Sequence, residues 1–148
     1  MKTHMLYLLA VSILCFNSCK PAQTKTVHLR KLEFKGEGLK VITSSVNEKS
    51  GTMSLLYGNE SALAYSIKGN DIHQSGEIFK QVTYKQQDHE LWYGSKINGA
   101  LLYVETIKTI RHGESIIPVY TIEYYGETKP DQIAGTRFIL KQRASVFP

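Results

Sequence analysis

Histidines near carboxylates are the first residues of this sequence that could do chemistry. His73, His89 and His112 each lie within two residues of an aspartate or a glutamate. Imidazole and carboxylate groups bind zinc when three or four of them converge on one point. The chain contains no paired spacing such as His-Glu-x-x-His, and each of these histidines lies in or beside a predicted turn. We therefore expect solvated loop histidines and no metal site, with an enzyme that uses one of the three as the catalytic alternative.

Serines and glutamates could supply a nucleophile or an acid–base pair. Ser75 follows His73 by two residues, and Ser115 directly follows a glutamate. Neither serine lies in a Gly-x-Ser-x-Gly elbow, and a triad is defined by geometry rather than by spacing. The glutamates on predicted strands are expected to face solvent: Glu77, Glu90, Glu105 and Glu123. The chain also lacks a Walker sequence and a Gly-x-Gly-x-x-Gly loop. We predict no catalytic residue, no cofactor and no enzymatic activity.

Tyrosine is the most unusual feature of the composition, with nine tyrosines and one tryptophan among 148 residues. Most of the tyrosines fall in predicted strands, where a half-buried ring packs and its hydroxyl reaches water. Adjacent strand residues point to opposite faces, so one member of Trp92-Tyr93 and one of Tyr124-Tyr125 leaves the core side. Trp and Tyr provide a large contact area at low entropic cost. We predict that these four residues form an exposed aromatic contact.

The N-terminal segment is predicted to be a signal peptide of residues 1–18. Lys2 precedes an apolar run at residues 5–16, which is shorter than the roughly 20 residues that a membrane-spanning helix needs. Cys19 follows Ser18, and a small residue before this cysteine resembles the cleavage site of a bacterial lipoprotein. That resemblance implies cleavage before Cys19 and acylation of its thiol. A plain signal peptide with a chance cysteine is the alternative.

Lipidation would tether a folded domain to a membrane rather than insert it. Residues 19–26 are the lipidated cysteine and a polar tether, and residues 27–148 form the domain. The formal charge of +5 becomes +4 in the mature chain, because Lys2 is removed. Several acyl chains anchor a protein stably, so membrane lipid is the expected partner at Cys19. We expect a location in the cell envelope, at the outer membrane or the periplasmic face. Nucleic acid is not an expected partner, because the lysines are spread along the chain.

Short runs rich in β-branched and aromatic residues, separated by turn residues, make up the rest of the chain. They predict strands at 27–34, 38–46, 52–57, 61–68, 76–84, 89–94, 99–110, 116–125 and 135–142. Two segments between the predicted strands are candidates for helical turns: 70–75 and 130–134, where Pro130 would begin the turn. Pro118 must lie at a strand start, an edge or a bulge, because it cannot donate to a strand ladder. The pattern predicts an all-β fold, a single antiparallel β-barrel or barrel-like sandwich of about eight or nine strands.

Residues 52–104 resemble the membrane-bound and periplasmic inhibitors of C-type lysozyme, which are small exported β-barrels that plug the lysozyme cleft. The shared features follow one another in the same order: Tyr57, Ala62-Leu63, Ser75-Gly76, Phe79, Trp92 and Ala100-Leu101. In that family a Ser-Gly turn and a Trp-x-Lys-Gly turn present an inhibitory serine and lysine. The resemblance implies these roles for Ser75 and Lys96. The chain departs from the family because it lacks the cysteine pair and has Ile97, not glycine, after the lysine.

We predict a membrane-anchored, exported lipoprotein that acts as a non-catalytic binding module. The first version is an inhibitor or immunity-type protein that acts on a cell-wall hydrolase through Ser75 and Lys96. A lipocalin-like carrier of a small apolar ligand and a structural subunit of an envelope assembly are the alternatives. The binding surface is predicted to include the aromatic pairs Trp92-Tyr93 and Tyr124-Tyr125.

Overall fold

The computed structural model describes residues 34, 36, 38–69 and 72–145. The chain divides into two units, residues 1–31 and 32–148, and every described residue belongs to the second unit. The predicted signal peptide, the lipidated Cys19 and the tether therefore lie outside the described residues. The strand expected at 27–34 also lies outside them, apart from its last residue.

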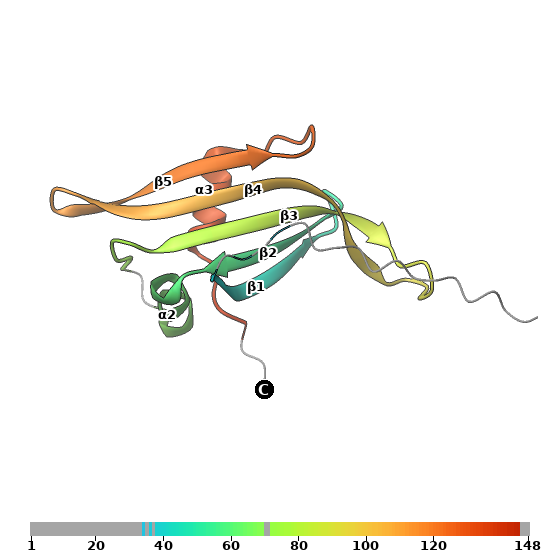
Figure 1. Ribbon diagram of the computed structural model, residues 1–148, viewed down its shortest axis with the longest axis horizontal. Coiled ribbons are helices and arrows are strands. Elements are labelled where there is room, and N and C mark those ends of the chain that lie inside the picture. Colours follow the sequence, from blue (N-terminus) through green and yellow to red (C-terminus); the bar gives the residue numbers. More distant parts are fainter. Residues whose placement is uncertain (1–33, 35, 37, 70–71, 146–148) are drawn as a thin grey trace, which may run out of the picture. The chain divides into compact units, whose positions relative to one another are not determined.

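Five antiparallel strands form one sheet, in which the strand order follows the sequence (Figure 1). The strands are β1 (Lys40–Asn47), β2 (Thr52–Gly58), β3 (Ile78–Asp88), β4 (Lys96–His112) and β5 (Ser115–Tyr124). Helix α2 (Glu60–Lys68) connects β2 to β3, and helix α3 (Gln132–Leu140) follows β5. The mostly β, antiparallel architecture is thereby confirmed.

The sheet is open rather than closed in the part of the chain that the structure describes. β1 and β5 are its two edges, and no closed barrel is shown. The expectation of about eight or nine strands depended on segments that form other structures. Residues 61–68 and 135–140 lie in helices, and residues 90–94 form bends and a turn. Residues 72–74, where a helical turn was the alternative, form no helix.

Residues 61–68 form most of helix α2 because two capping residues define its ends. The side-chain oxygen of Asn59 accepts the backbone N–H of Ala62 at 3.0 Å, which begins the helix. Gly69 ends it with a φ of 70°, a left-handed conformation that glycine adopts without strain. Its N–H donates to the carbonyl of Tyr65 at 3.1 Å. The strand prediction rested on the aromatic and β-branched residues of this run and did not take the caps into account.

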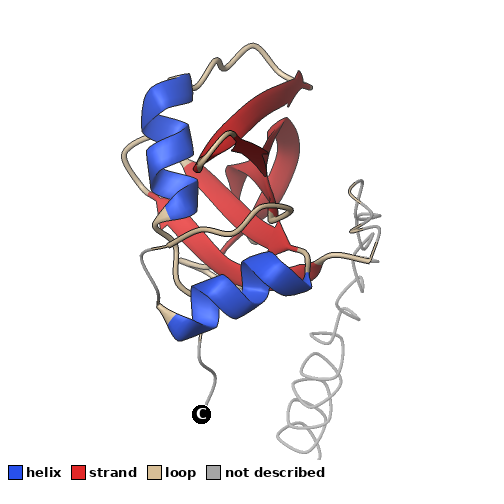
Figure 2. Ribbon diagram, turned by 90° about the vertical axis from the view of Figure 1, so that its left-hand side faces the viewer, coloured by secondary structure: helices blue, strands red, loops and turns tan. Residues whose placement is uncertain are grey.

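Helix α3 contains most of the segment expected as the last strand. Asp131 begins the helix, because its carboxylate accepts the N–H groups of Ile133 and Ala134 at 2.8 and 3.1 Å. The alternative of a helical turn at 130–134 is thus confirmed in position. The helix continues well past that turn, because its inner side packs on the sheet (Figure 2).

The two faces of the sheet are covered by different parts of the chain. On one face both helices contribute to a core of Ile42, Leu56, Ala62, Phe79, Ile107 and Ile139. On the other face Phe34 and Leu39 pack against a second cluster, which contains Tyr57, Val82, Tyr84, Leu101 and Val104. Strand β4 contributes Ile107 to one cluster and Val104 to the other. This arrangement explains why both sides of that strand are apolar in the sequence.

Candidate functional site

The β3–β4 hairpin extends beyond the rest of the sheet (Figure 1). Its end carries exposed aromatic residues. β2 pairs with β3 only as far as Lys85, and β5 pairs with β4 only from Tyr103 onward. Beyond these two residues, β3 and β4 pair as strands only with each other within the described residues. At the end of this arm Leu91, Trp92 and Tyr93 are 55%, 67% and 107% exposed. Tyr93 and Trp92 are the two most exposed aromatic side chains in the described residues.

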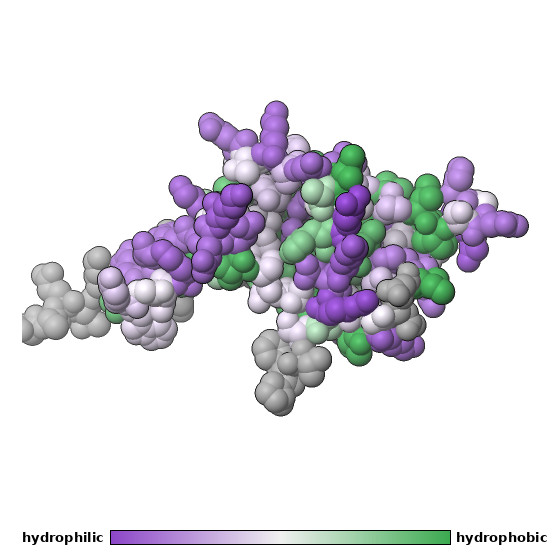
Figure 3. Space-filling model, turned by 180° about the vertical axis from the view of Figure 1, so that it is seen from behind, coloured by the Kyte–Doolittle hydropathy of each residue, from purple (hydrophilic) through white to green (hydrophobic). Residues whose placement is uncertain are grey.

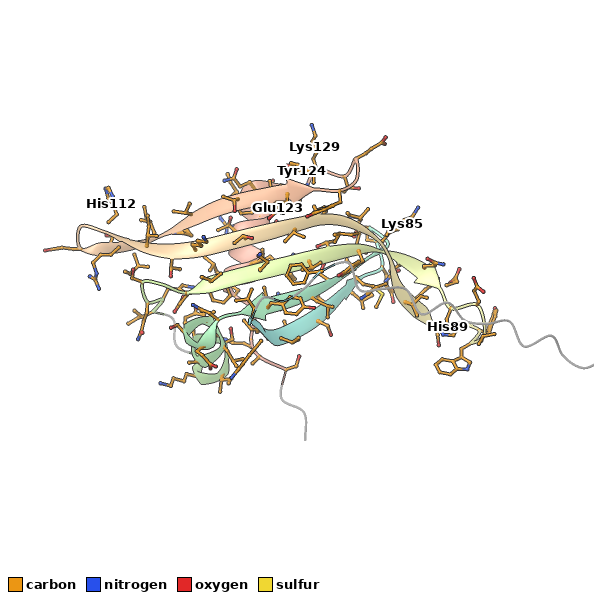
Figure 4. The ribbon with its side chains drawn as sticks, viewed as in Figure 1. Lys85, His89, His112, Glu123, Tyr124 and Lys129 are labelled. Carbon is orange, nitrogen blue, oxygen red and sulfur yellow. The ribbon has the colours of Figure 1, made fainter. Side chains whose placement is uncertain are left out.

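His89 orders the hairpin tip, which we define as residues 89–95. Its Nδ1 accepts the backbone N–H groups of Leu91 and Trp92 at 3.1 and 3.2 Å. Its ring stacks on the Trp92 indole, with the ring centroids 4.7 Å apart and an interplanar angle of 12° (Figure 4). The indole is therefore held in place within the tip itself.

Lys96 lies at the base of the hairpin tip, where it forms an ion pair with Asp88. Both side chains are largely exposed, so this pair stabilises the fold by at most about 1 kcal/mol. Both charges also remain accessible to another molecule. The structure thus brings Lys96 into one segment with Trp92 and Tyr93.

Ser75 lies at the opposite end of β3 from Lys96. Strand β3 begins three residues after Ser75, and its last residue, Asp88, pairs with Lys96. An extended strand of 11 residues spans roughly 30 Å. Ser75 and Lys96 therefore lie at opposite ends of β3. A narrow cleft of a partner protein cannot contact both residues at once.

Tyr124 and Tyr125 lie at the end of the edge strand, away from the hairpin tip. Both are exposed, and the Tyr125 hydroxyl donates to Glu123 at 3.2 Å. Tyr124 pairs with Tyr103, which lies seven residues along β4 from Lys96 (Figure 4). The two predicted aromatic pairs therefore do not form one surface.

A partly buried His–Glu pair lies beside α2, where the sequence predicted a solvated histidine and an exposed glutamate. Glu77 is 1% exposed, and its Oε2 lies 2.6 Å from Nδ1 of His73. The other carboxylate oxygen accepts the N–H of Gln74 at 2.9 Å. The His73 ring stacks on Tyr65 with centroids 3.9 Å apart. The solvent-facing prediction for Glu77 was wrong, because Glu77 lies just before β3 begins and the neighbouring backbone and imidazole satisfy its carboxylate.

A second buried carboxyl lies under α3. Glu105 is 1% exposed, its Oε1 accepts the Tyr120 hydroxyl at 2.9 Å, and its Oε2 accepts the Gln81 amide at 3.1 Å. Burial raises the pKa of the Glu105 carboxyl, and the two hydrogen bonds oppose part of that rise. Burial also raises the pKa of Tyr120, and its hydrogen bond to Glu105 adds to the rise. The prediction of a solvent-facing Glu105 was wrong. The apolar residues on both faces of β4 were the signal that could have corrected it.

The raised pKa of Glu105 predicts that this carboxyl makes the fold less stable as the pH rises. Between the ordinary glutamate pKa of about 4.3 and its raised value in the fold, the folded state holds the proton and the unfolded state does not. The stabilisation by this group is complete below the unfolded-state pKa and is lost as the pH rises through the folded-state pKa. Urea unfolding of the wild type and of Glu105→Gln measures this from about pH 4 to pH 8. We expect the free energy of unfolding of the wild type to fall relative to that of Glu105→Gln as the pH rises. The same pH dependence of the unfolding free energy in both proteins would contradict this prediction.

Comparison with known proteins assigns no family to this chain. No protein-family model matches the sequence, and no curated protein matches it. Within the described ranges no cluster of three or more histidine, cysteine, aspartate or glutamate residues could hold a metal ion. Of the helices that the structure describes, none is both long enough and apolar enough to cross a membrane.

Proposed function

We propose that this chain is an exported, lipid-anchored and non-catalytic binding module. It inserts the hairpin tip into a cleft of a partner protein, and the proposed partner class is a cell-wall hydrolase. The observation that carries the proposal is the consecutive exposure of Leu91, Trp92 and Tyr93 at the end of a projecting arm. Aromatic residues of this kind dominate the binding energy of protein interfaces when a partner desolvates them.

The order of the hairpin tip supports this role. A loop that already has its bound shape loses little conformational entropy on binding, so more of the contact energy contributes to affinity. The hydrogen bonds from Leu91 and Trp92 to His89 provide that order, together with the bond from the N–H of His89 to the carbonyl of Ser95 at 2.9 Å. A projecting, convex arm also suits a concave partner site.

The charge at the base of the tip supports a cleft that contains carboxylates. Lys96 lies where the arm would meet the rim of the cleft, and its ammonium group is accessible. Hydrolases that act on polysaccharides carry a pair of catalytic carboxylates in the cleft. A lysine near these groups adds electrostatic complementarity. In this proposal Lys96 takes part in the contact, and Ser75 does not, because it lies at the other end of β3.

A panel of cell-wall hydrolases that includes C-type lysozyme tests the proposal, with inhibition by the folded domain as the measurement. We expect Trp92→Ala and Tyr93→Ala each to weaken inhibition at least about tenfold, since such residues contribute more than 1 kcal/mol at an interface. Neither change should alter the free energy of unfolding, because both side chains are exposed. Tyr125→Ala, an exposed tyrosine outside the tip, is the matched control. Absence of inhibition, or inhibition that both tip variants retain, contradicts the proposal.

The anchor is tested separately from the tip. We expect cells that express the full chain to incorporate labelled fatty acid into it, and the Cys19→Ala variant to lose this label, because the thiol is the proposed attachment site. The label and the membrane fraction are measured together after detergent extraction. Equal labelling of both chains would show that the lipid is attached elsewhere or not at all. Loss of the anchor should leave inhibition by the soluble domain unchanged.

A further inference from the structure

The outer edge of β5 has unpaired backbone groups whose positions follow from the strand register. Thr109 of β4 pairs with Pro118 and directs both of its backbone groups toward the β3 side. Its N–H donates to the backbone carbonyl of Glu77 at 3.0 Å, and its carbonyl accepts the N–H of Gly76 at 2.8 Å. At the other end of β5 the N–H of Tyr125 donates back to Leu102 in β4. Antiparallel strands alternate between such positions. The even-numbered residues of β5 therefore direct their N–H and C=O groups to the outer edge, where no strand of the described residues pairs with them.

Pro118 limits which part of this edge can accept another strand. The structure confirms that this proline lies in an edge strand, and its missing N–H faces outward. Pairing along the first half of β5 is therefore interrupted. Backbone N–H and C=O groups point outward at Tyr120, Ile122 and Tyr124. The edge that is open to another strand therefore begins after Pro118.

A groove lies beside this open edge, between β5 and the first turns of α3. It has a volume of about 380 Å³ and is lined by Pro118, Tyr120, Gln132, Ile133, Thr136 and Arg137. The helix begins at β5 and crosses the sheet toward β1 and β2, where Ile139 joins the core (Figure 2). On the face that carries α3, hydrophobic side chains gather between hydrophilic ones (Figure 3). Ile133 is 73% exposed although it lines the groove, so an apolar side chain of another molecule could cover it.

Arg137 gives the groove a positive charge. Within the described residues Arg137 forms no salt bridge with an acidic side chain. Its guanidinium carries donors in a geometry that matches a carboxylate. A ligand that fits this place combines three features: an extended backbone for the strand edge, an apolar side chain for the groove, and a carboxylate for the arginine.

We propose that the β5 edge and the α3 groove bind an extended, acidic peptide segment of a partner protein by strand addition. The peptide pairs with Tyr120, Ile122 and Tyr124, places an apolar side chain against Ile133, and places a carboxylate on Arg137. Strand addition of this kind derives affinity from backbone hydrogen bonds and specificity from the pockets beside the edge. This site is separate from the hairpin tip and does not depend on the function proposed for the tip.

The test uses short synthetic peptides of alternating valine and threonine, in which one glutamate occupies each position in turn. Fluorescence anisotropy of labelled peptides measures binding to the wild-type chain, and hydrogen exchange measures protection of the edge amides. We expect one or two glutamate positions to bind best, and the amides of Tyr120, Ile122 and Tyr124 to become protected only with peptide. Arg137→Glu should weaken binding about tenfold and remove the preference for glutamate position. Lys85→Glu, which makes the same charge change on an exposed residue of β3, should not.

A second variant tests the edge itself. Ile122→Pro removes an outward N–H and no bond to β4, as Pro118 already does in the same strand, and it should abolish binding. Three results overturn the proposal: no peptide binds, a peptide binds without protecting the edge amides, or both variants bind as the wild type does. A fourth is protection of these amides in the free protein together with a dimeric mass in solution. That result would assign the edge to a second copy of this chain.

Discussion

Replacement of Phe79 by alanine is expected to lower the free energy of unfolding by about 3–5 kcal/mol. Phe79 is fully buried in the core that the sheet shares with both helices. It meets Tyr65 and His73 edge to face, with centroid distances of 6.3 and 6.0 Å, and it pairs with Ile107 in β4. Alanine leaves a cavity under α2 that these neighbours cannot fill, because each of them belongs to a different element.

Urea unfolding followed by circular dichroism measures the effect of Phe79→Ala. Phe138→Ala is the matched control, since Phe138 lies on α3 and is 46% exposed. We expect that control to change stability by less than about 1 kcal/mol. A similar small change for Phe79→Ala would mean that the helices do not pack on the sheet as the structure shows.

Replacement of Gly135 by alanine is expected to destabilise the protein by about 1–3 kcal/mol, although the residue lies inside a helix. At an exposed helix position, the same change stabilises by about 1 kcal/mol. Here an added Cβ lies 2.5 Å from Oε1 of Glu105. That oxygen also accepts the Tyr120 hydroxyl, so the carboxyl moves away only at the expense of a buried hydrogen bond.

A double-mutant cycle with Glu105→Ala separates this clash from any general effect of the substitution on α3. In the Glu105→Ala background the Oε1 atom is absent, so Gly135→Ala should be neutral or stabilising. The same destabilisation in both backgrounds would show that the helix does not press on Glu105. Urea unfolding of the four proteins at one pH below neutrality completes the cycle.

Five of the predicted strands are present in the sheet, and each of these runs is rich in β-branched and aromatic residues and lies between turn residues. The predicted runs 38–46, 52–57, 76–84, 99–110 and 116–125 correspond to the five strands of the sheet. The strand prediction at 61–68 was wrong, because the buried residues Ala62 and Ser66 lie four residues apart, which is the spacing of a helix. The deciding signals were Asn59 and Gly69, which are local and readable. The strand prediction at 135–142 failed in the same way, because Asp131 begins a helix that packs on a distant core.

The candidate site was also predicted only in part from the sequence. The sequence predicted Trp92 and Tyr93 as contact residues because adjacent strand residues point to opposite faces, and it predicted Lys96 from the family resemblance. It did not show that His89 holds the tip, because that contact depends on the turn geometry of the loop. It also placed Ser75 with Lys96, and the length of β3 separates them.

Sequence alone predicted the antiparallel β character of this protein and the position of the five strands of the sheet. It restricted Pro118 to a strand start, an edge or a bulge, and it predicted an exposed aromatic contact that includes Trp92 and Tyr93. These features follow from local preferences: alternation, turn residues and the missing N–H of proline. Only the tertiary structure decided that Glu77 and Glu105 are buried and that the five strands of the described residues form an open sheet. It also decided that α3 crosses the sheet beside the β5 edge. Each of these depends on contacts between residues far apart in the chain, and local preferences carry no information about such contacts.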